Sequence, residues 1–463
     1  MKLKTTFLAL FLFNSVFAQQ KPTINLSYSK WLATYDFVKN LSDNYPDNGF
    51  KQVFRASKFY NPHYTDLIKR FDTLKLDESY NFQDFPEGLK TPFQSIDFIK
   101  KNLITATSIE QFKTETFGVV PNSELFAFSE ILSEFKPIYD ELIYFPHQNE
   151  FENQLVELKD YVQKSNLEKF FEQGLIFYGS AWDNSVPMDI AIIPSIEKDR
   201  FNAGAFLNTA FGKIPLNIKE IGNDDLFSVL MHEIYHILYD AQPLEFKLKI
   251  QSWFNKNPSK NSQYAYLLLN EVLATATGNG YVYEHLNGKP YEGDWYNFKY
   301  FNLLAKQIYP MVKDYINQQK TIDQDFVNQY IAFYDAFPDW SNELDNLFRN
   351  RYVLSDNPKD IDYFRKNYVA SHGIDEDVFS QSNLEKLKEA RLTKVIIISS
   401  DHKDKLSRVK SIFPELKNLK YNARKEFVYT ADLQDKTKLI IINKHSTSLE
   451  KLFDDNFKNR KIE

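Results

Sequence analysis

The stretch that decides the fold is MHEIYHIL, at residues 231–238. Two histidines four residues apart, with a glutamate after the first, stand inside an apolar run whose spacing predicts a helix. Positions i and i+4 of a helix lie on the same face, so His232 and His236 can bind one metal ion through their imidazoles. Glu233 points away from that axis, where it can act as a general base. The stretch therefore predicts a metal site.

A chance match is the alternative interpretation for so short a motif, because the chain contains eight histidines. The flanking sequence argues against chance. Asn223, Asp224 and Asp225 offer N-cap oxygens and negative charge at a helix start, and Pro243 follows the expected helix end. Most of the residues between are apolar, so the histidines and the glutamate would be buried and would need partners.

A catalytic zinc ion needs a third protein ligand and one open position. Glu271 is the best candidate, because it is an acidic residue inside a second apolar helix predicted at 264–277. A lone carboxylate there is costly without a partner, and zinc would be that partner; the alternative is a solvated helix position. Asp240 also shares the face of His236, but it lies one turn further along the same helix and cannot easily complete a tetrahedron. It could instead accept a hydrogen bond from an imidazole.

The two motifs together resemble those of the gluzincin group of zinc metallopeptidases. Gluzincins combine H-E-x-x-H on one helix with N-E-x-x-A or a close variant on a later helix, and this chain has HEIYH at 232–236 and NEVLA at 270–274. The resemblance covers roughly residues 175–280. It implies three zinc ligands and one general base: His232, His236 and Glu271 as ligands, and Glu233 as the base.

Two features depart from the best-known gluzincins. The gap between the second histidine and Glu271 is longer, and residues 243–262 could form an inserted helix and loop. The segment GAFLN at 204–208 resembles the G-A-M-E-N strand of the aminopeptidase branch, but Leu207 stands where that branch has the glutamate that binds the free amine of the substrate. The resemblance therefore favours an endopeptidase, in which this edge strand still pairs with the substrate backbone.

The oxyanion that develops during hydrolysis needs a hydrogen-bond donor in addition to the metal. In gluzincins a Tyr or His downstream of the glutamate ligand supplies it. Tyr283 and His285 are our candidates, with Tyr281, Tyr330 and Tyr334 as further ones. Packing is the alternative role for each of them, because the chain is rich in aromatic residues, with 41 Phe and 28 Tyr.

The chain around this centre predicts a mainly α-helical α+β protein, with a zincin-like catalytic domain that contains a small β-sheet and an active-site helix. Residues 27–173 have the apolar spacing of helices. Strands are expected just before the histidine helix, at 175–178, 189–194, 201–209 and 214–218. Helices are expected after it, at 246–254, 264–277, 300–318, 324–337 and 340–348.

A change in composition near Thr393 predicts a small C-terminal α/β module. Its elements are expected to be strands at 394–400, 427–429 and 439–442 and helices at 401–412 and 446–453. The module contains no glycine, so it lacks the glycine-rich turn of a nucleotide site, and we assign no role to His402 and His445. The expected domains are a signal peptide at 1–18, an N-terminal helical region at 19–174, the catalytic domain at 175–392 and the module at 393–463.

The N-terminus predicts export. Lys2 and Lys4 precede an apolar segment at 7–13 and a small-residue cleavage site that ends at Ala18, which is the pattern of a secretory signal. That segment is too short to span a bilayer. We therefore expect a periplasmic or secreted protein with no membrane span. The chain has no cysteine, so it forms no disulfides, and a net charge of −6 gives no basic excess for nucleic acid.

These features together predict an exported zinc-dependent peptidase, a hydrolase with Zn²⁺ as cofactor and a peptide or protein as substrate. The alternative is an exported helical binding protein with a structural or vestigial zinc site. An intact Glu233 argues against that alternative, because a structural site needs no base. Hydrolysis of a non-peptide amide is a third hypothesis. The sequence does not specify the oligomeric state.

Overall fold

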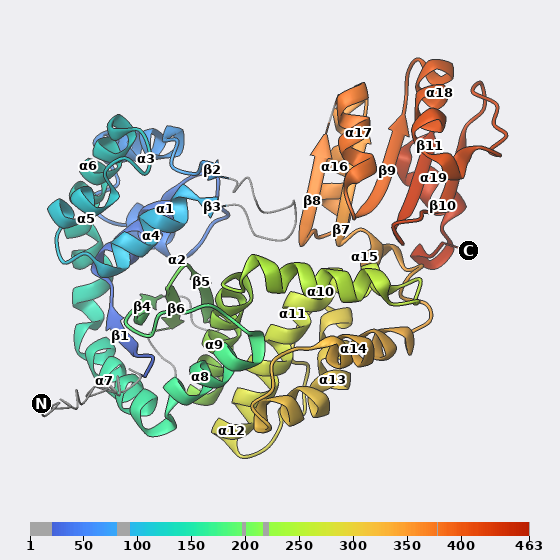
Figure 1. The fold of residues 1–463 in the computed structure, drawn as a ribbon. Helices are drawn as coiled ribbons and strands as arrows, with labels where there is room; N and C mark the ends of the chain where they lie inside the picture. The colour runs from blue at the N-terminus through green and yellow to red at the C-terminus, as the bar shows by residue number, and fades with distance from the viewer. Residues whose placement is uncertain (1–20, 81–92, 197–200, 216–221, 377, 463) are drawn as a thin grey trace, which may run out of the picture.

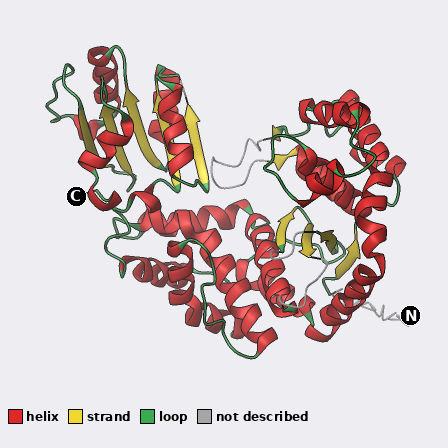
Figure 2. Ribbon diagram, turned by 180° about the vertical axis from the view of Figure 1, so that it is seen from behind, coloured by secondary structure: helices red, strands yellow, loops and turns green. Residues whose placement is uncertain are grey.

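The structure, a computed structural model, describes residues 21–80, 93–196, 201–215, 222–376 and 378–462. The predicted signal peptide lies outside the described residues. An N-terminal helical region and a C-terminal α/β module flank a central body of helices that contains the histidine helix (Figure 1). Helices predominate over strands throughout (Figure 2). The expected mainly α-helical α+β class is therefore confirmed.

The N-terminal helices form a bundle around an aromatic core. Four of them begin at a side-chain cap: Ser29, Asn48, Asn61 and Ser108 each accept a backbone N–H of the first turn. The elements of this region are α1 (Lys30–Leu41), α2 (Gly49–Arg55), α3 (Pro62–Thr73), β2 (Ser79–Tyr80), β3 (Phe93–Gln94), α4 (Ser95–Thr105), α5 (Ile109–Thr116), α6 (Asn122–Tyr139), η1 (Asp140–Tyr144), η2 (Phe145–His147), α7 (Gln148–Ser165) and α8 (Leu167–Tyr178).

A four-stranded sheet separates this bundle from the central helices. Its strands are β1 (Ile24–Tyr28), β4 (Met188–Ser195), β5 (Asn202–Phe206) and β6 (Thr209–Pro215), in the order β1-β4-β6-β5. The first three strands in that order are parallel, and β5 is an antiparallel edge strand. Alternate residues of β4 serve two different cores. Ile190 and Ile192 pack with the central helices, whereas Ala191 and Ile193 pack with the N-terminal bundle.

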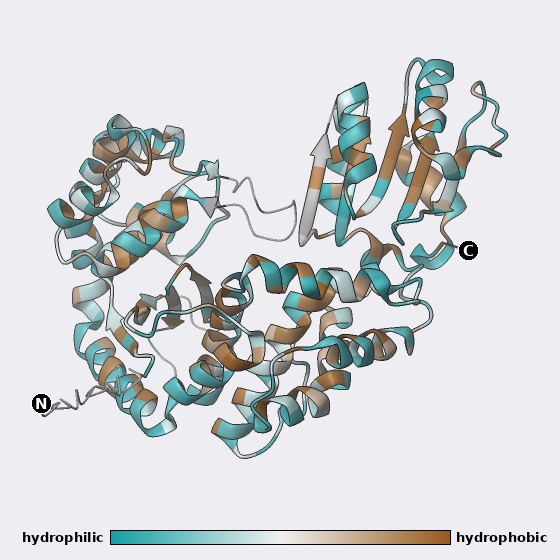
Figure 3. Ribbon diagram, viewed as in Figure 1, coloured by the Kyte–Doolittle hydropathy of each residue, from teal (hydrophilic) through white to brown (hydrophobic). Residues whose placement is uncertain are grey.

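The central body follows the sheet and carries the candidate site. Its elements are α9 (Asn223–Asp240), α10 (Leu244–Lys256), α11 (Ser262–Ala274), the π-helix η3 (Thr275–Val282), α12 (Tyr283–Asn287), α13 (Lys299–Asn317), α14 (Gln324–Asp335) and α15 (Leu344–Leu347). Apolar residues dominate α9 and α11 (Figure 3). None of the helices in the described part of the chain is both long enough and apolar enough to cross a bilayer.

The C-terminal module is a five-stranded sheet with helices on both faces. Its elements are β7 (Asn350–Ser355), α16 (Pro358–Asn367), β8 (His372–Glu376), α17 (Gln381–Glu389), β9 (Thr393–Ile398), α18 (His402–Ile412), η4 (Pro414–Leu416), β10 (Phe427–Asp432), β11 (Lys438–Asn443), α19 (Leu449–Asn456) and η5 (Lys458–Arg460). The strand order is β10-β11-β9-β7-β8, and only β10 is antiparallel to its neighbour.

Four sequence predictions differ from the structure. The strand expected at 201–209 is interrupted by the turn at 207–208, and β6 already begins at Thr209. Residues 175–178, expected as a strand, are the last turn of α8, because Gly179 in a left-handed conformation ends the helix there. The helix expected at 340–348 is only the four residues of α15. The sheet of the module includes β7, which begins at Asn350, so a boundary at 393 passes through the sheet.

The module also shares a core with the central body. Val353, Val395 and Ile440, on one face of its sheet, belong to the same hydrophobic cluster as α9 and α11. At the N-terminus of α11, Tyr264 is hydrogen-bonded to Thr393 of β9 and accepts the backbone N–H of the residue that begins β11. The module therefore helps to fix the position of the helix that carries Glu271.

Candidate metal centre

Helix α9 presents its histidines from the interior of the protein. The helix begins at Asn223 with Gly222 at the cap position, and Asp224 and Asp225 provide the expected negative charge in its first turn. Ten of its residues are buried, among them His232. His236 follows one turn later on the same face. The sequence prediction of a buried helix that carries two histidines is thus confirmed.

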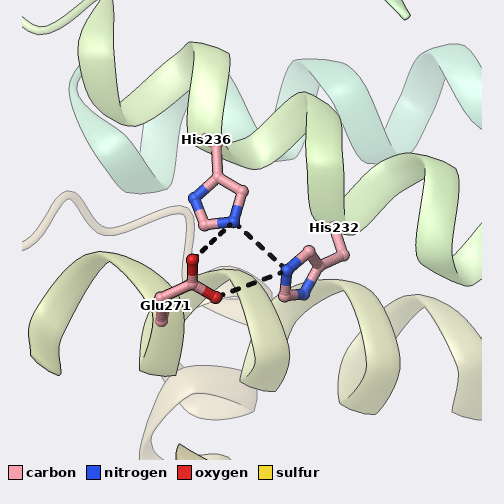
Figure 4. Close-up of side chains that lie close together, drawn as sticks. All are labelled: His232, His236 and Glu271. Carbon is pink, nitrogen blue, oxygen red and sulfur yellow. Dashed lines mark hydrogen bonds and ion pairs between the residues drawn. The ribbon is translucent and has the colours of Figure 1, made fainter. Parts of the chain in front are cut away.

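Glu271 of α11 completes a three-residue group with the two histidines. The Nε2 atoms of His232 and His236 lie 3.2 Å apart. The Glu271 carboxylate oxygens lie 3.8 Å from His232 Nε2 and 3.6 Å from His236 Nε2 (Figure 4). These three residues form a group that could hold a metal ion, with ligand atoms within 4.8 Å of one another. Asp240 is not part of the group.

Asn270 orients the imidazole of His236. Its side-chain oxygen lies 2.9 Å from Nδ1 of His236. An amide oxygen can only accept a hydrogen bond, so Nδ1 carries the proton and Nε2 offers its lone pair to the centre. Ligand histidines in metal sites are commonly held by such an acceptor on the other ring nitrogen. Asn270 therefore has the orienting role that the sequence analysis considered for Asp240.

The chain itself satisfies the polar atoms of the group only in part: Asn279 and Ala274 act on His232, and Tyr296 is hydrogen-bonded to Glu271. His232 Nδ1 and Glu271 Oε2 are buried and have no hydrogen-bond partner within normal geometry. Burial and the neighbouring imidazole of His236 lower the pKa of His232 to about 3, so this ring is neutral and can be a ligand. Two imidazole nitrogens that face each other beside a carboxylate fit a divalent cation, which would satisfy all three groups at once.

The π-helix η3 allows the two ligand helices to approach closely. Gly278 of η3 packs against the backbone of His232, and a Cβ atom at this position would lie 2.6 Å from the His232 Cα. Only glycine fits so close an approach. A π-helical turn widens the helix locally and is common at functional sites. The segment after Glu271 is therefore shaped to receive the helix that carries the histidines.

Glu233 lies beside the group without belonging to it. Burial raises the pKa of the Glu233 carboxyl, and the Glu271 carboxylate adds to this rise, whereas His236 opposes it. A carboxyl group with a raised pKa is suited to accept and return a proton near neutral pH. Its position agrees with the general-base role that the sequence predicts.

The aromatic residue that the structure brings to the group is Tyr296, between α12 and α13. Its ring lies 5.9 Å from the ring of His232. Burial raises the pKa of Tyr296 above its usual value, and the charge of Glu271 and a hydrogen bond to this carboxylate add to the rise, whereas Arg349 opposes it. The phenol therefore remains protonated and can donate a hydrogen bond.

The predicted oxyanion donors Tyr283 and His285 have their described contacts elsewhere. Tyr283 packs against Tyr291 and faces the acidic first turn of α9. His285 is exposed, and its Nδ1 donates to the carbonyl of Tyr281 at 2.8 Å. The short helix α12 turns both side chains away from the group.

The further tyrosine candidates are packing residues, as the alternative interpretation holds. Tyr281 lies 4.1 Å, ring to ring, from His285. Tyr330 donates to the carbonyl of Ala265, and Tyr334 accepts from the side chain of Asn346.

The edge strand β5 runs beside α9. It carries the first part of the GAFLN segment, and its outer edge is unpaired among the described strands. Leu207 lies in the tight turn between β5 and β6 with a positive φ of 57°. The residue at the position of the amine-binding glutamate is therefore apolar and lies in a turn.

Comparisons with models of known protein families, with curated proteins and with solved structures found no match for this chain.

Proposed function

We propose that this chain is an exported zinc-dependent peptidase of the gluzincin type, with His232, His236 and Glu271 as the zinc ligands. The observation that carries the proposal is the convergence of two imidazole nitrogens and one carboxylate beside a half-buried glutamate that is not a ligand. A set of three protein ligands leaves one position open, as in catalytic sites, whereas structural zinc sites have four. When bound, zinc would supply a Lewis acid that polarises a carbonyl and acidifies water.

The residues of the chain would carry the proton transfers. Glu233 takes a proton as the oxygen of a water molecule forms a bond to the scissile carbonyl carbon. Tyr296 donates a hydrogen bond to the oxyanion that develops. When the C–N bond breaks, Glu233 returns the proton to the leaving nitrogen, so that the amine departs neutral. The unpaired edge of β5 would align the substrate backbone.

The position of Leu207 favours an endopeptidase. An aminopeptidase needs an acidic residue to bind the free amine of the substrate, and no carboxylate stands at this place in the turn after β5. Without that anchor, the substrate chain could extend past the sheet edge in both directions.

The test is Glu233→Gln. Glutamine keeps the size of the side chain but cannot accept the proton, so hydrolysis of a peptide library should fall by a factor on the order of 10² or more. Zinc content, measured by mass spectrometry of the purified protein, should stay at that of the unchanged chain.

Two results of this experiment would count against the proposal. Turnover within a few-fold of the unchanged protein would exclude Glu233 as the base. A zinc-loaded protein that cleaves none of the library peptides would instead favour the helical binding protein with a structural metal.

A further inference from the structure

Arg349 is a cation placed over an aromatic surface near the metal centre. It lies between α15 and β7, where the central body joins the module. Its guanidinium carbon lies 4.6 Å from the ring centroid of Phe298 and 5.2 Å from that of Phe301. Its Nε donates to Ser371 Oγ. Stacking and this hydrogen bond hold one edge of the guanidinium group in a fixed orientation.

A continuous row of rings connects Arg349 with the metal ligands. The ring of Phe301 packs edge-on against Tyr296 at 5.2 Å, and the ring of Tyr296 lies 5.9 Å from that of His232. The charge of Arg349 acts on both Tyr296 and Glu271. The guanidinium group thus lies on the Tyr296 side of the centre.

The surroundings of Arg349 differ from those of four arginines that pair with acidic residues. Arg55, Arg70, Arg408 and Arg460 each form an ion pair with a carboxylate. Among the described residues, no carboxylate forms an ion pair with Arg349, and the side chain is only partly exposed. The carboxylate whose charge acts on Arg349 is that of Glu271. A bound metal cation would coordinate this carboxylate.

Metal binding would therefore add positive charge on this side of the centre. A divalent cation bound to Glu271 brings two positive charges, so the carboxylate of Glu271 would no longer offset the charge of Arg349. The planar fork of an arginine matches the two oxygens of a carboxylate and forms two parallel hydrogen bonds with it. A carboxylate is thus the group that complements this side of the centre.

We propose that Arg349 binds a carboxylate of the substrate on the Tyr296 side of the metal centre and makes the enzyme selective for peptides with an acidic group there. This inference rests on the proposed peptidase function. The carboxylate can be the C-terminus of a short peptide or an Asp or Glu side chain. The chemistry is the same in both cases, and the experiment separates the two sources.

The experiment measures binding without turnover. Zinc-loaded Glu233→Gln protein is immobilised and exposed to matched N-acetylated peptide libraries with a free C-terminal acid or a C-terminal amide, each made with Glu or with Gln inside the sequence. Retained peptides are identified by mass spectrometry. Hydrogen bonds to a charged partner are worth about 1.5–3 kcal/mol, so the acidic form should be retained about 10- to 100-fold better than its neutral match.

The pattern of retention identifies the source of the carboxylate. A preference for free acids over amides indicates the C-terminus, and a preference for internal Glu over Gln indicates a side chain. Adding Arg349→Gln should abolish the preference, and Arg349→Lys should keep part of it. The matched control is Arg408→Gln. Arg408 lies on α18 and pairs with Asp404, so this change should leave the preference unchanged.

Equal retention of acidic and neutral peptides, or no retention of either, would overturn the inference. This comparison uses the protein with Arg349 intact, so it decides the question even if the Arg349 variants fail to fold. Failure of the peptidase function gives a different result. In that case acidic peptides are retained selectively, but the unchanged zinc-loaded protein cleaves none of them.

Discussion

Two of the places where charged side chains gather in buried surroundings lie between α9 and α11 and at the ends of β7 and β9 in the C-terminal module. At the second place the chain satisfies its own charges. Asp356 accepts the backbone N–H of Ser399 at 2.9 Å and pairs with Lys405. Asp360 pairs with Lys444 at 3.1 Å. The side chains of both aspartates are less than a tenth exposed.

The position of this second cluster makes the comparison informative. The sheet of the module changes direction between β7 and β9, because the chain continues from β7 to β8 on one side and β9 lies on the other. Ligands of open α/β sheets usually bind in the crevice at such a switch point. Here two lysines of the chain itself supply the positive charge that complements the aspartates.

The centre between α9 and α11 shows the opposite condition. His232 Nδ1 and Glu271 Oε2 are buried without hydrogen-bond partners. The Nε2 atoms of the two imidazoles face each other at 3.2 Å, and the tautomers decide which of them donates. A buried polar group without a partner costs free energy. A metal ion held by the two Nε2 atoms would remove that cost for Glu271 Oε2, but not for His232 Nδ1 on the other side of its ring. The difference indicates that the capacity to bind a group from outside lies at α9 and α11.

Of the variants that test this comparison, Glu271→Ala should have the largest effect, because it should remove most of the bound zinc. It removes the only ligand that does not come from α9, and two imidazoles on one helix do not enclose an ion. Most of the zinc should be lost on dialysis against a weak chelator, as measured by metal analysis. Glu245→Ala, on the exposed start of α10, is the matched control and should keep its zinc. A Glu271→Ala protein with stoichiometric zinc would show that the gluzincin assignment is wrong.

Asp356→Asn should break the second cluster without affecting the first. The change takes from Lys405 the nearer and more buried of its two carboxylates and leaves only the exposed Asp401 at 4.0 Å. Loss of one partner of a buried pair costs about 3–5 kcal/mol, and the remaining contact with Asp401 offsets part of this. Denaturant unfolding of the two proteins measures this loss, and metal analysis should give the same zinc content for both. A loss of zinc would show that the two clusters are coupled through the shared core.

The same aspartate also predicts a pH dependence. Burial opposes its ionisation, but Lys405 and hydrogen bonds from Ser400 and Ser399 outweigh burial and lower the pKa of Asp356 in the folded protein. The unfolded chain therefore binds the proton more tightly, so the contribution of Asp356 to stability is complete above about pH 4 and is lost as the pH falls below it. The stability difference between the unchanged protein and Asp356→Asn should shrink in that range.

Gly278→Ala should disturb the metal centre by packing alone. The added Cβ would meet the backbone of His232 at 2.6 Å, and backbone cannot move aside as a flexible side chain can. Overpacking of this kind costs about 1–3 kcal/mol, and separation of η3 from α9 should weaken zinc binding as well. Gly212→Ala is the matched control, because its Cβ would meet only the ends of flexible side chains, the nearest being Ile192 at 3.3 Å. Equal zinc affinity in both variants would contradict this role for Gly278.

Local patterns in the sequence were sufficient to predict the centre of the site. The spacing of His232 and His236 follows from helical geometry, and an acidic residue in an apolar helix identified Glu271. Asn270 stands beside Glu271 in the motif, but the sequence does not show which way its side chain points. That orientation depends on how α9 and α11 cross, which is a property of the packed core.

Contacts between distant segments explain what the sequence did not predict. Tyr296, whose ring lies near His232, and Arg349, whose charge acts on Glu271, come from two separate connections, and neither belongs to a periodic pattern. β7 pairs with β9, yet the two strands are separated along the chain by α16, β8 and α17. The change in composition near 393 therefore marked the most apolar strand of the sheet and not its first strand.

Asn270→Ala should have the smallest effect. The His236 ring would lose the acceptor that fixes its Nδ1 proton, but all three ligands would remain. Loss of such an orienting group typically weakens metal binding 10- to 100-fold. Asn270→Asp restores an acceptor at the same position and should recover most of the affinity, whereas Asp240→Ala, further along α9, should change it less than Asn270→Ala does. Competition with a chelator of known affinity measures all three. If Asp240→Ala proves the more damaging variant, His236 is oriented from α9 and not from α11, and the tautomer inferred from Asn270 is wrong.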